Sequence, residues 1–306
     1  MPEATGSPPP LSKARVFLRR LVSFVVLWTI VLTALFSASR TVSNGVFIVI
    51  MVFLASTGLA EFYGLVQKRG LACFERCGIV GGVLLMVGTF LNLTGVLGTS
   101  GTPSRVNDFE TSFLILFVLG LCLRKFFSRS QTSGLEAIST TLFGLMYVTW
   151  LLNFIQKINF FPAFPEEDGH YYLLYFILIT KISDSGAYVV GSLIGRHKMI
   201  PRVSPGKTWE GFGGAIAASI LASLVFARCF GRHMAGMNLA HAAVLGLILG
   251  LSAVVGDLIE SIFKREADVK DSGRFFPGIG GILDLLDSLL FNAPIMYLYL
   301  RHVLVP

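Results

Sequence analysis

The chain has 306 residues, of which 54% are hydrophobic and 14% charged, and its mean hydropathy is +0.72. Soluble domains carry about 25% charged residues, so this composition excludes a soluble protein with an apolar core. The formal net charge of +7 would suit a nucleic-acid partner. The cations, however, follow the loops between apolar runs rather than one recognition face, so we expect no nucleic-acid binding.

Nine apolar runs follow one another along the chain, each long enough or nearly so to cross a hydrocarbon layer about 30 Å thick. Because lipid offers no hydrogen bonds to the backbone and no alternating barrel pattern occurs, we expect helices. The predicted fold class is therefore an all-α polytopic integral membrane protein. The expected spans are 18–38, 45–66, 77–98, 110–123, 135–156, 171–194, 211–230, 238–260 and 281–300.

Lys and Arg residues are distributed unevenly about these spans. Most fall in the N-terminal segment and in alternate loops, and this bias appears only when all nine spans are counted. Positively charged loops face the cytoplasm, which places the N-terminus inside and the C-terminus on the opposite side. We expect an integral protein of the bacterial inner (cytoplasmic) membrane, with its active site facing the cytoplasm.

Composition divides the chain into parts. Residues 1–12, rich in Pro, Ser and Gly, are expected to be a disordered tail. Residues 13–170 form an N-terminal transmembrane bundle with almost purely apolar spans, and residues 171–306 form a C-terminal catalytic region. Glu61 and Glu136 interrupt the first part near helix ends, where we expect structural or interfacial roles.

The second part carries charged pairs inside or beside its spans. A carboxylate at mid-bilayer costs at least ~2.5–3.5 kcal/mol on insertion scales, so such residues usually have a function. A spacing of three places both members of a pair on one helix face. The pairs are Lys181 with Asp184, Asp257 with Glu260, and Asp284 with Asp287.

Three of these acids indicate a metal site. Asp257, Asp284 and Asp287 come from two helices joined through the glycine-rich stretch 277–281. Mg²⁺ is typically held by one or two carboxylates, with substrate phosphates supplying further oxygens, and this set leaves room for a second metal ion. The alternative is that the acids form structural ion pairs with nearby cations, namely Lys264, Arg265, Lys270 and Arg274.

The segment 202–211 superficially resembles a nucleotide-binding P-loop because it contains Gly206-Lys207-Thr208. The earlier glycine of that motif is missing, since Pro201 takes its place, and no strand is expected before it. What remains is a cationic turn, with Ser204 and Lys207, at the start of a helix whose free amides suit a phosphate. An ordinary cytoplasmic loop with a helix cap is an equally good explanation.

The sixth span contains Gly186, Gly191 and Gly195, which permit close helix packing. Packing does not require the carboxylate of Asp184, which we therefore keep as a functional candidate.

Three stretches resemble the motifs of the phosphatidate cytidylyltransferase (CDP-diacylglycerol synthase) family. The pattern S-x-F-K-R-x4-K-D-x-G-x2-F-P-x-x-G-G-I-x-D-x-L-D, from Ser261 to Asp287, is similar to the family signature. Upstream, D-S-G-A-Y-x-x-G-x-x-x-G at 184–195 and S-P-x-K-T-x-E-G at 204–211 are similar to two further motifs. The resemblance covers about 180–300.

The resemblance implies transfer of CMP from CTP to phosphatidate, giving CDP-diacylglycerol and pyrophosphate for phospholipid synthesis. The expected partners are CTP, phosphatidate within the bilayer and membrane lipids, and we also consider a homodimer. The resemblance assigns catalytic roles to Lys264, Arg265, Lys270 and Asp271, substrate binding to Ser204, Lys207 and Asp184, and Mg²⁺ to Asp257, Asp284 and Asp287.

Two positions depart from the family pattern, with Ile279 in place of His and Leu285 in place of Arg. They leave open an altered lipid substrate or a non-catalytic relative. The same residues would also suit a CTP-dependent lipid kinase, a cytidylyltransferase acting on another lipid, or an ion-coupled transporter. The gathering of acids with basic cytoplasmic loops argues against transport, because transport sites lie near the bilayer midplane.

Overall fold

The computed structural model describes residues 28–29, 31–33, 35–96, 103–128, 133–161, 166–273 and 280–304. In this part of the chain almost all regular structure is helical, and one short hairpin supplies the strands. The longer helices are α2 (Arg40–Lys68), α3 (Glu75–Leu93), α4 (Pro103–Phe127), α5 (Gly134–Gly144), α6 (Leu151–Asn159), α7 (Glu166–Ile194), α8 (Trp209–Phe230), α9 (Leu239–Glu266) and α10 (Ile282–Tyr299).

The prediction of an all-α polytopic membrane protein is confirmed. Within the described ranges, eight helical segments are long and apolar enough to cross a membrane. One of them joins α5 to α6 through a π-helical segment, Leu145–Trp150. The first expected span, 18–38, and the expected tail, 1–12, lie largely or wholly outside the described residues.

Helix α4 is longer than the span 110–123 that was expected and begins at Pro103; Arg105 and Asp108 in its first turns are exposed, whereas Glu110 is buried in the bundle. Glu110 is only 3% exposed and accepts hydrogen bonds from Lys157 at 2.6 Å, Asn153 at 3.0 Å and Trp150 at 3.1 Å. The expected span 135–156 is also extended, since α6 continues to Asn159. A buried carboxylate bonded in this way no longer requires the helix to end at the membrane surface.

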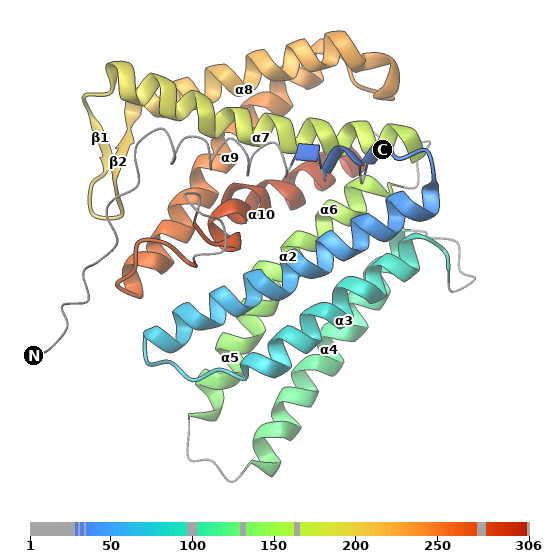
Figure 1. Ribbon diagram of the computed structural model, residues 1–306, viewed down its shortest axis with the longest axis vertical. Helices are drawn as coiled ribbons and strands as arrows, with labels where there is room; N and C mark the ends of the chain where they lie inside the picture. Colours follow the sequence, from blue (N-terminus) through green and yellow to red (C-terminus); the bar gives the residue numbers. More distant parts are fainter. Residues whose placement is uncertain are drawn as a thin grey trace, which may run out of the picture.

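Helix α10 lies between the two halves of the chain. Helices α7 and α8 run side by side, α9 packs against α8 and α10, and α3 packs between α2 and α4 (Figure 1). Helix α10 also contacts α2 and α6, and its Leu286, Leu290 and Ala293 are almost fully buried. Asn292 of α10 donates to Leu249 of α9 at 3.0 Å and to Thr180 of α7 at 2.9 Å. Such polar contacts join helices within the apolar interior.

The close packing expected from the glycines of the sixth span is confirmed. A side chain at Gly186 would overlap Ala218, and one at Gly214 would overlap Val190. Small residues therefore let the backbones of α7 and α8 approach closely over this region.

A β-hairpin connects α7 to α8. Strand β1 (Lys198–Ile200) pairs antiparallel with β2 (Ser204–Thr208), with Lys198 opposite Thr208. Thr208 begins the next helix, because its hydroxyl accepts a hydrogen bond from the Gly211 amide at 3.1 Å. The hairpin lies near the end of α9, where the Arg265 side chain donates to the Val203 carbonyl at 3.0 Å.

Candidate functional site

Three carboxylates from two helices gather where α9 approaches its C-terminus. Asp257 and Glu260 of α9 and Asp287 of α10 each place one carboxylate oxygen within 4.8 Å of the others. We call this set the acidic trio. The helices meet closely because Gly256 has no side chain, and a Cβ there would lie 2.8 Å from the Asp287 carbonyl oxygen. A larger residue would force the two helices, and hence the trio, apart.

Two lysines contact the trio from different elements. Lys207, in β2, places its ammonium 2.8 Å from Asp257 Oδ2 and 3.3 Å from the Val254 carbonyl. Lys264, in the last turns of α9, lies 3.0 Å from Glu260 Oε2 and 2.6 Å from Asp284 Oδ1. The cationic hairpin is therefore joined to the acids by Lys207, while Thr208 of the same hairpin caps α8.

Asp284, the third predicted metal ligand, lies beside the trio and makes its contacts with other groups. Its carboxylate accepts from the Ser272 amide at 3.0 Å, the Ser272 hydroxyl at 3.0 Å and the Gly281 amide at 2.7 Å, besides its contact with Lys264. The three carboxylates that lie together are those of Asp257, Glu260 and Asp287, so Glu260 belongs to the trio and Asp284 does not. The carboxylate of Asp284 instead connects three groups: Ser272 in the loop after α9, Gly281 at the start of α10, and Lys264.

Asp184 belongs to a neighbouring polar group on α7. Its carboxylate accepts from the Ser288 hydroxyl at 3.2 Å and lies 3.6 Å from the Lys181 ammonium. Lys181 also donates to the Leu285 carbonyl at 2.9 Å. Ser288 follows Asp287 directly, and its amide donates to Asp287 Oδ1 at 2.5 Å. Asp184 is thus connected to the trio through Ser288, which contacts both Asp184 and Asp287.

The remaining predicted residues lie around the site without a described contact to the trio. Arg265 is exposed and bonded to Val203. Lys270 and Asp271 are exposed in the loop after α9, and Ser204 is half-buried at the start of β2. Ile279 lies outside the described residues. Leu285, the other departure from the family pattern, offers the carbonyl that receives Lys181.

The trio fits a hard divalent cation. Glu260 is fully buried, and its Oε1 has no hydrogen-bond partner in the described structure. Three carboxylates share two lysines, of which Lys264 is also engaged by Asp284, so negative charge is in excess. Carboxylate oxygens are the ligands that Mg²⁺ prefers. An unpaired buried oxygen in a net-negative cluster is well satisfied by such an ion.

Glu260 and Ser288 were not among the predicted site residues, although the sequence contains a feature that points to each of them. Glu260 follows Asp257 by three positions on one helix face, yet the metal was expected at Asp284 instead. Ser288 adjoins Asp287. Glu61 was expected to have a structural role, and no local pattern links it to α10, which its carboxylate contacts.

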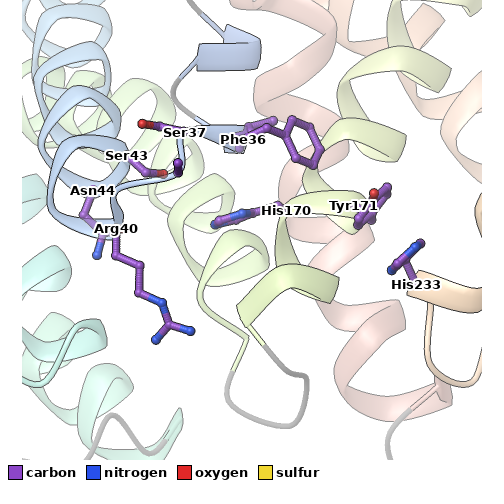
Figure 2. A pocket seen from close by; sticks show the side chains of 10 residues that line it. Phe36, Ser37, Arg40, Ser43, Asn44, His170, Tyr171 and His233 are labelled. Carbon is purple, nitrogen blue, oxygen red and sulfur yellow. The ribbon is translucent and has the colours of Figure 1, made fainter.

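Two cavities lie outside the trio. One, of about 280 Å³, lies between α2, α5 and α9, where Phe62, Phe143 and Phe263 form apolar walls and Arg69 and Glu266 lie at its edge. The other, of about 300 Å³, lies beside the start of α2, at the opposite end of that helix from Arg69. Figure 2 shows His170 in it, between Arg40 on one side and Tyr171 with His233 on the other. None of the three carboxylates of the trio lines this second cavity.

The fold and the site together describe an integral membrane protein with carboxylates and lysines gathered near one end of its helices. The sequence model of the cytidylyltransferase family matches residues 18–303, and the chain belongs to this family.

Individual relatives agree with this membership. The chain is 34% identical over 224 residues to a phosphatidate cytidylyltransferase of Staphylococcus saprophyticus, an alignment covering 70% of this chain and 82% of that one. It is 38% identical over 189 residues to a phosphatidate cytidylyltransferase of Staphylococcus epidermidis, covering 61% and 70%. It is 36% identical over 162 residues to the uncharacterized protein YnbB of Escherichia coli K12, covering 53% of this chain and about half, 51%, of YnbB.

Proposed function

We propose that the chain is a phosphatidate cytidylyltransferase, which transfers CMP from CTP to phosphatidate and releases pyrophosphate. A phosphate oxygen of phosphatidate forms a bond to the α-phosphorus of CTP, and the bond from that phosphorus to the pyrophosphate oxygen breaks. The observation that carries the proposal is the acidic trio, flanked by Lys207 and Lys264, in a chain of the cytidylyltransferase family.

The trio is the proposed holder of Mg²⁺, through Asp257, Glu260 and Asp287. An ion bound there would neutralise oxygens of the triphosphate and of the leaving pyrophosphate. The reaction otherwise needs positioning and charge neutralisation, because the attacking phosphate is already ionised near pH 7 and requires no general base.

The lysines are the proposed phosphate ligands of the chain itself. Lys207 already lies against Asp257 and Lys264 against Glu260, so a phosphate that approaches the trio meets both ammonium groups. Asp284 would hold Lys264 in place rather than bind metal, since it is saturated by Ser272, Gly281 and Lys264. The pair of Lys181 and Asp184 would orient Ser288, beside Asp287.

Four further residues complete the proposed site around the trio and its two lysines. Arg265 fixes the hairpin that carries Lys207, by its bond to the Val203 carbonyl. Ser204, Lys270 and Asp271 are proposed to meet the nucleotide from β2 and from the loop after α9. The site is proposed to face the cytoplasm of a bacterial inner membrane, where CTP is available, while phosphatidate enters from the bilayer with its acyl chains still in lipid.

Purified protein in mixed micelles tests the function. Supplied with α-labelled CTP, phosphatidate and Mg²⁺, it should move label into the lipid fraction, and omission of phosphatidate or addition of EDTA should stop this. If α-label enters lipid only when another lipid phosphate is supplied, that lipid replaces phosphatidate as the substrate. Label from γ-labelled CTP that enters a lipid alcohol would instead show a CTP-dependent lipid kinase. Folded protein that transfers no label to any of these lipids would overturn the proposal.

A further inference from the structure

Glu61 of α2 caps the first turn of α10, more than two hundred residues further along the chain. Its Oε1 accepts the Ile282 amide at 3.0 Å, and its Oε2 accepts the Leu283 amide at 2.8 Å. The first amides of a helix have no partner inside the helix and are usually capped by a side chain at its start. Gly281 stands at that position and has no side chain, so the N-terminal half of the protein supplies the cap.

The same carboxylate reaches the loop before α10. The Ser272 hydroxyl lies 3.1 Å from Glu61 Oε2 and 3.0 Å from Asp284 Oδ2. Asp284 in turn accepts the Gly281 amide and pairs with Lys264 at 2.6 Å, and Lys264 contacts Glu260 of the trio. A continuous series of polar contacts therefore leads from α2 to the proposed phosphate ligand.

Two glycines make room for the Glu61 carboxylate. A Cβ added at Gly273 or at Gly281 would overlap its oxygens. The space is shaped to receive this side chain, and the charge of the carboxylate is favourable at the start of a helix.

We propose that Glu61 is a positioning residue for the cytidylyltransferase reaction. It fixes the start of α10 and Ser272, so that Asp284 holds Lys264 where the triphosphate binds. This inference rests on the proposed function. Glu61 has no described contact with the acidic trio itself and reaches it only through Ser272, Asp284 and Lys264. Loss of Glu61 should therefore weaken CTP binding and leave the Mg²⁺ requirement close to that of the unmodified protein.

The variant Glu61→Gln tests the proposal, because Gln keeps the size of the side chain but replaces one acceptor oxygen with a donor. Its KM for CTP should rise about tenfold or more, while the Mg²⁺ concentration for half-maximal rate stays that of the unmodified protein. In the background of Lys264→Gln, the same change should add little, because residues that act through one another are not additive.

Glu136→Gln is the matched control. Glu136 also lies in the N-terminal half and accepts a backbone amide, that of Ala72 at 2.6 Å, but it has no described contact with the site. This control should leave the KM for CTP unchanged, whatever it does to the melting temperature. Gly273→Ala, whose Cβ would meet only the Glu61 side chain and displace its carboxylate, should reproduce the rise in KM and decides the matter if Glu61→Gln does not fold.

The outcomes separate this inference from the function on which it rests. Absence of label transfer by the unmodified protein would overturn the function itself. If the unmodified protein is active but Glu61→Gln keeps its KM for CTP and loses only melting temperature, Glu61 is structural and the inference is overturned. Full additivity with Lys264→Gln would overturn the proposed route through Lys264.

Discussion

The carboxylates of Glu260 and Asp284 differ in what surrounds them, and this difference decides their roles. Glu260 is fully buried with one oxygen unpaired, next to Asp257 and Asp287. Asp284 accepts two backbone amides, a hydroxyl and an ammonium. Only Glu260 has an oxygen that still needs a partner, and a buried unpaired oxygen is costly. We therefore expect the metal at Glu260.

Substitution of these two residues should consequently give different kinetic defects. Glu260→Gln removes a metal ligand, so the Mg²⁺ concentration for half-maximal label transfer should rise at least tenfold. Asp284→Asn loosens Lys264 instead, and it should raise the KM for CTP at an unchanged Mg²⁺ requirement. Titrations of Mg²⁺ and CTP in the micelle assay distinguish the two. Equal Mg²⁺ defects in both variants would place Asp284 in the metal site after all.

The spacing of residues predicted part of this site and could not predict the rest. Asp257, Asp287, Lys264 and Lys207 could be selected because carboxylates and lysines beside apolar spans are unusual. A helical spacing of three shows which residues share a face, but it does not show which of Asp284 and Glu260 meets Asp257. The contact of Glu61 with α10 depends on how α2 packs, and no local pattern contains that information.

At the scale of elements, helix boundaries depend on whether charges find partners. The predicted span 110–123 lies within α4, which begins earlier, at Pro103, and ends a few residues later, at Phe127. In the structure Glu110 and Lys157 are each 3% exposed and lie 2.6 Å apart. Hydropathy measures a helix alone and cannot anticipate that a cation of another helix neutralises its acid.

The buried pair of Glu110 and Lys157 should be a measurable source of stability. Glu110→Ala would leave the Lys157 ammonium buried without its partner, at a cost of about 3–5 kcal/mol in the free energy of unfolding. Thermal unfolding in detergent should show a lower melting temperature. The double variant Glu110→Gln with Lys157→Met should recover much of the loss. A melting temperature unchanged in Glu110→Ala would show that the pair is not needed.

At the scale of the whole molecule, the order of the eight spans that fall within the described residues was predictable because a bilayer imposes one length on every helix. The arrangement of the helices was not, since packing faces depend on small residues and polar contacts that hydropathy does not register. Gly186 and Gly214 bring α7 to α8, and Asn292 connects α10 to α7 and α9. These contacts place α10 at the centre, where it carries part of the site.

The predicted orientation follows from the positively charged loops and can be tested with single cysteines. The four native cysteines are first replaced, although Cys73 reacts poorly because burial raises the pKa of its thiol. Lys198→Cys in β1 and Arg232→Cys after α8 then place an exposed thiol on opposite ends. An impermeant maleimide added to intact cells should label position 232 and not position 198. The reverse pattern would mean that the site faces away from the cytoplasm.

The central claim is that Asp257, Glu260 and Asp287 together hold the metal of a CMP-transfer reaction. Binding of Mn²⁺ to the purified protein, followed by the loss of the free-ion signal in electron paramagnetic resonance, tests it most directly. The unmodified protein and Asp284→Asn should bind Mn²⁺ with similar affinity, whereas Asp287→Asn and Glu260→Gln should bind at least tenfold more weakly. Unchanged binding in Asp287→Asn and Glu260→Gln, with loss in Asp284→Asn, would contradict the account.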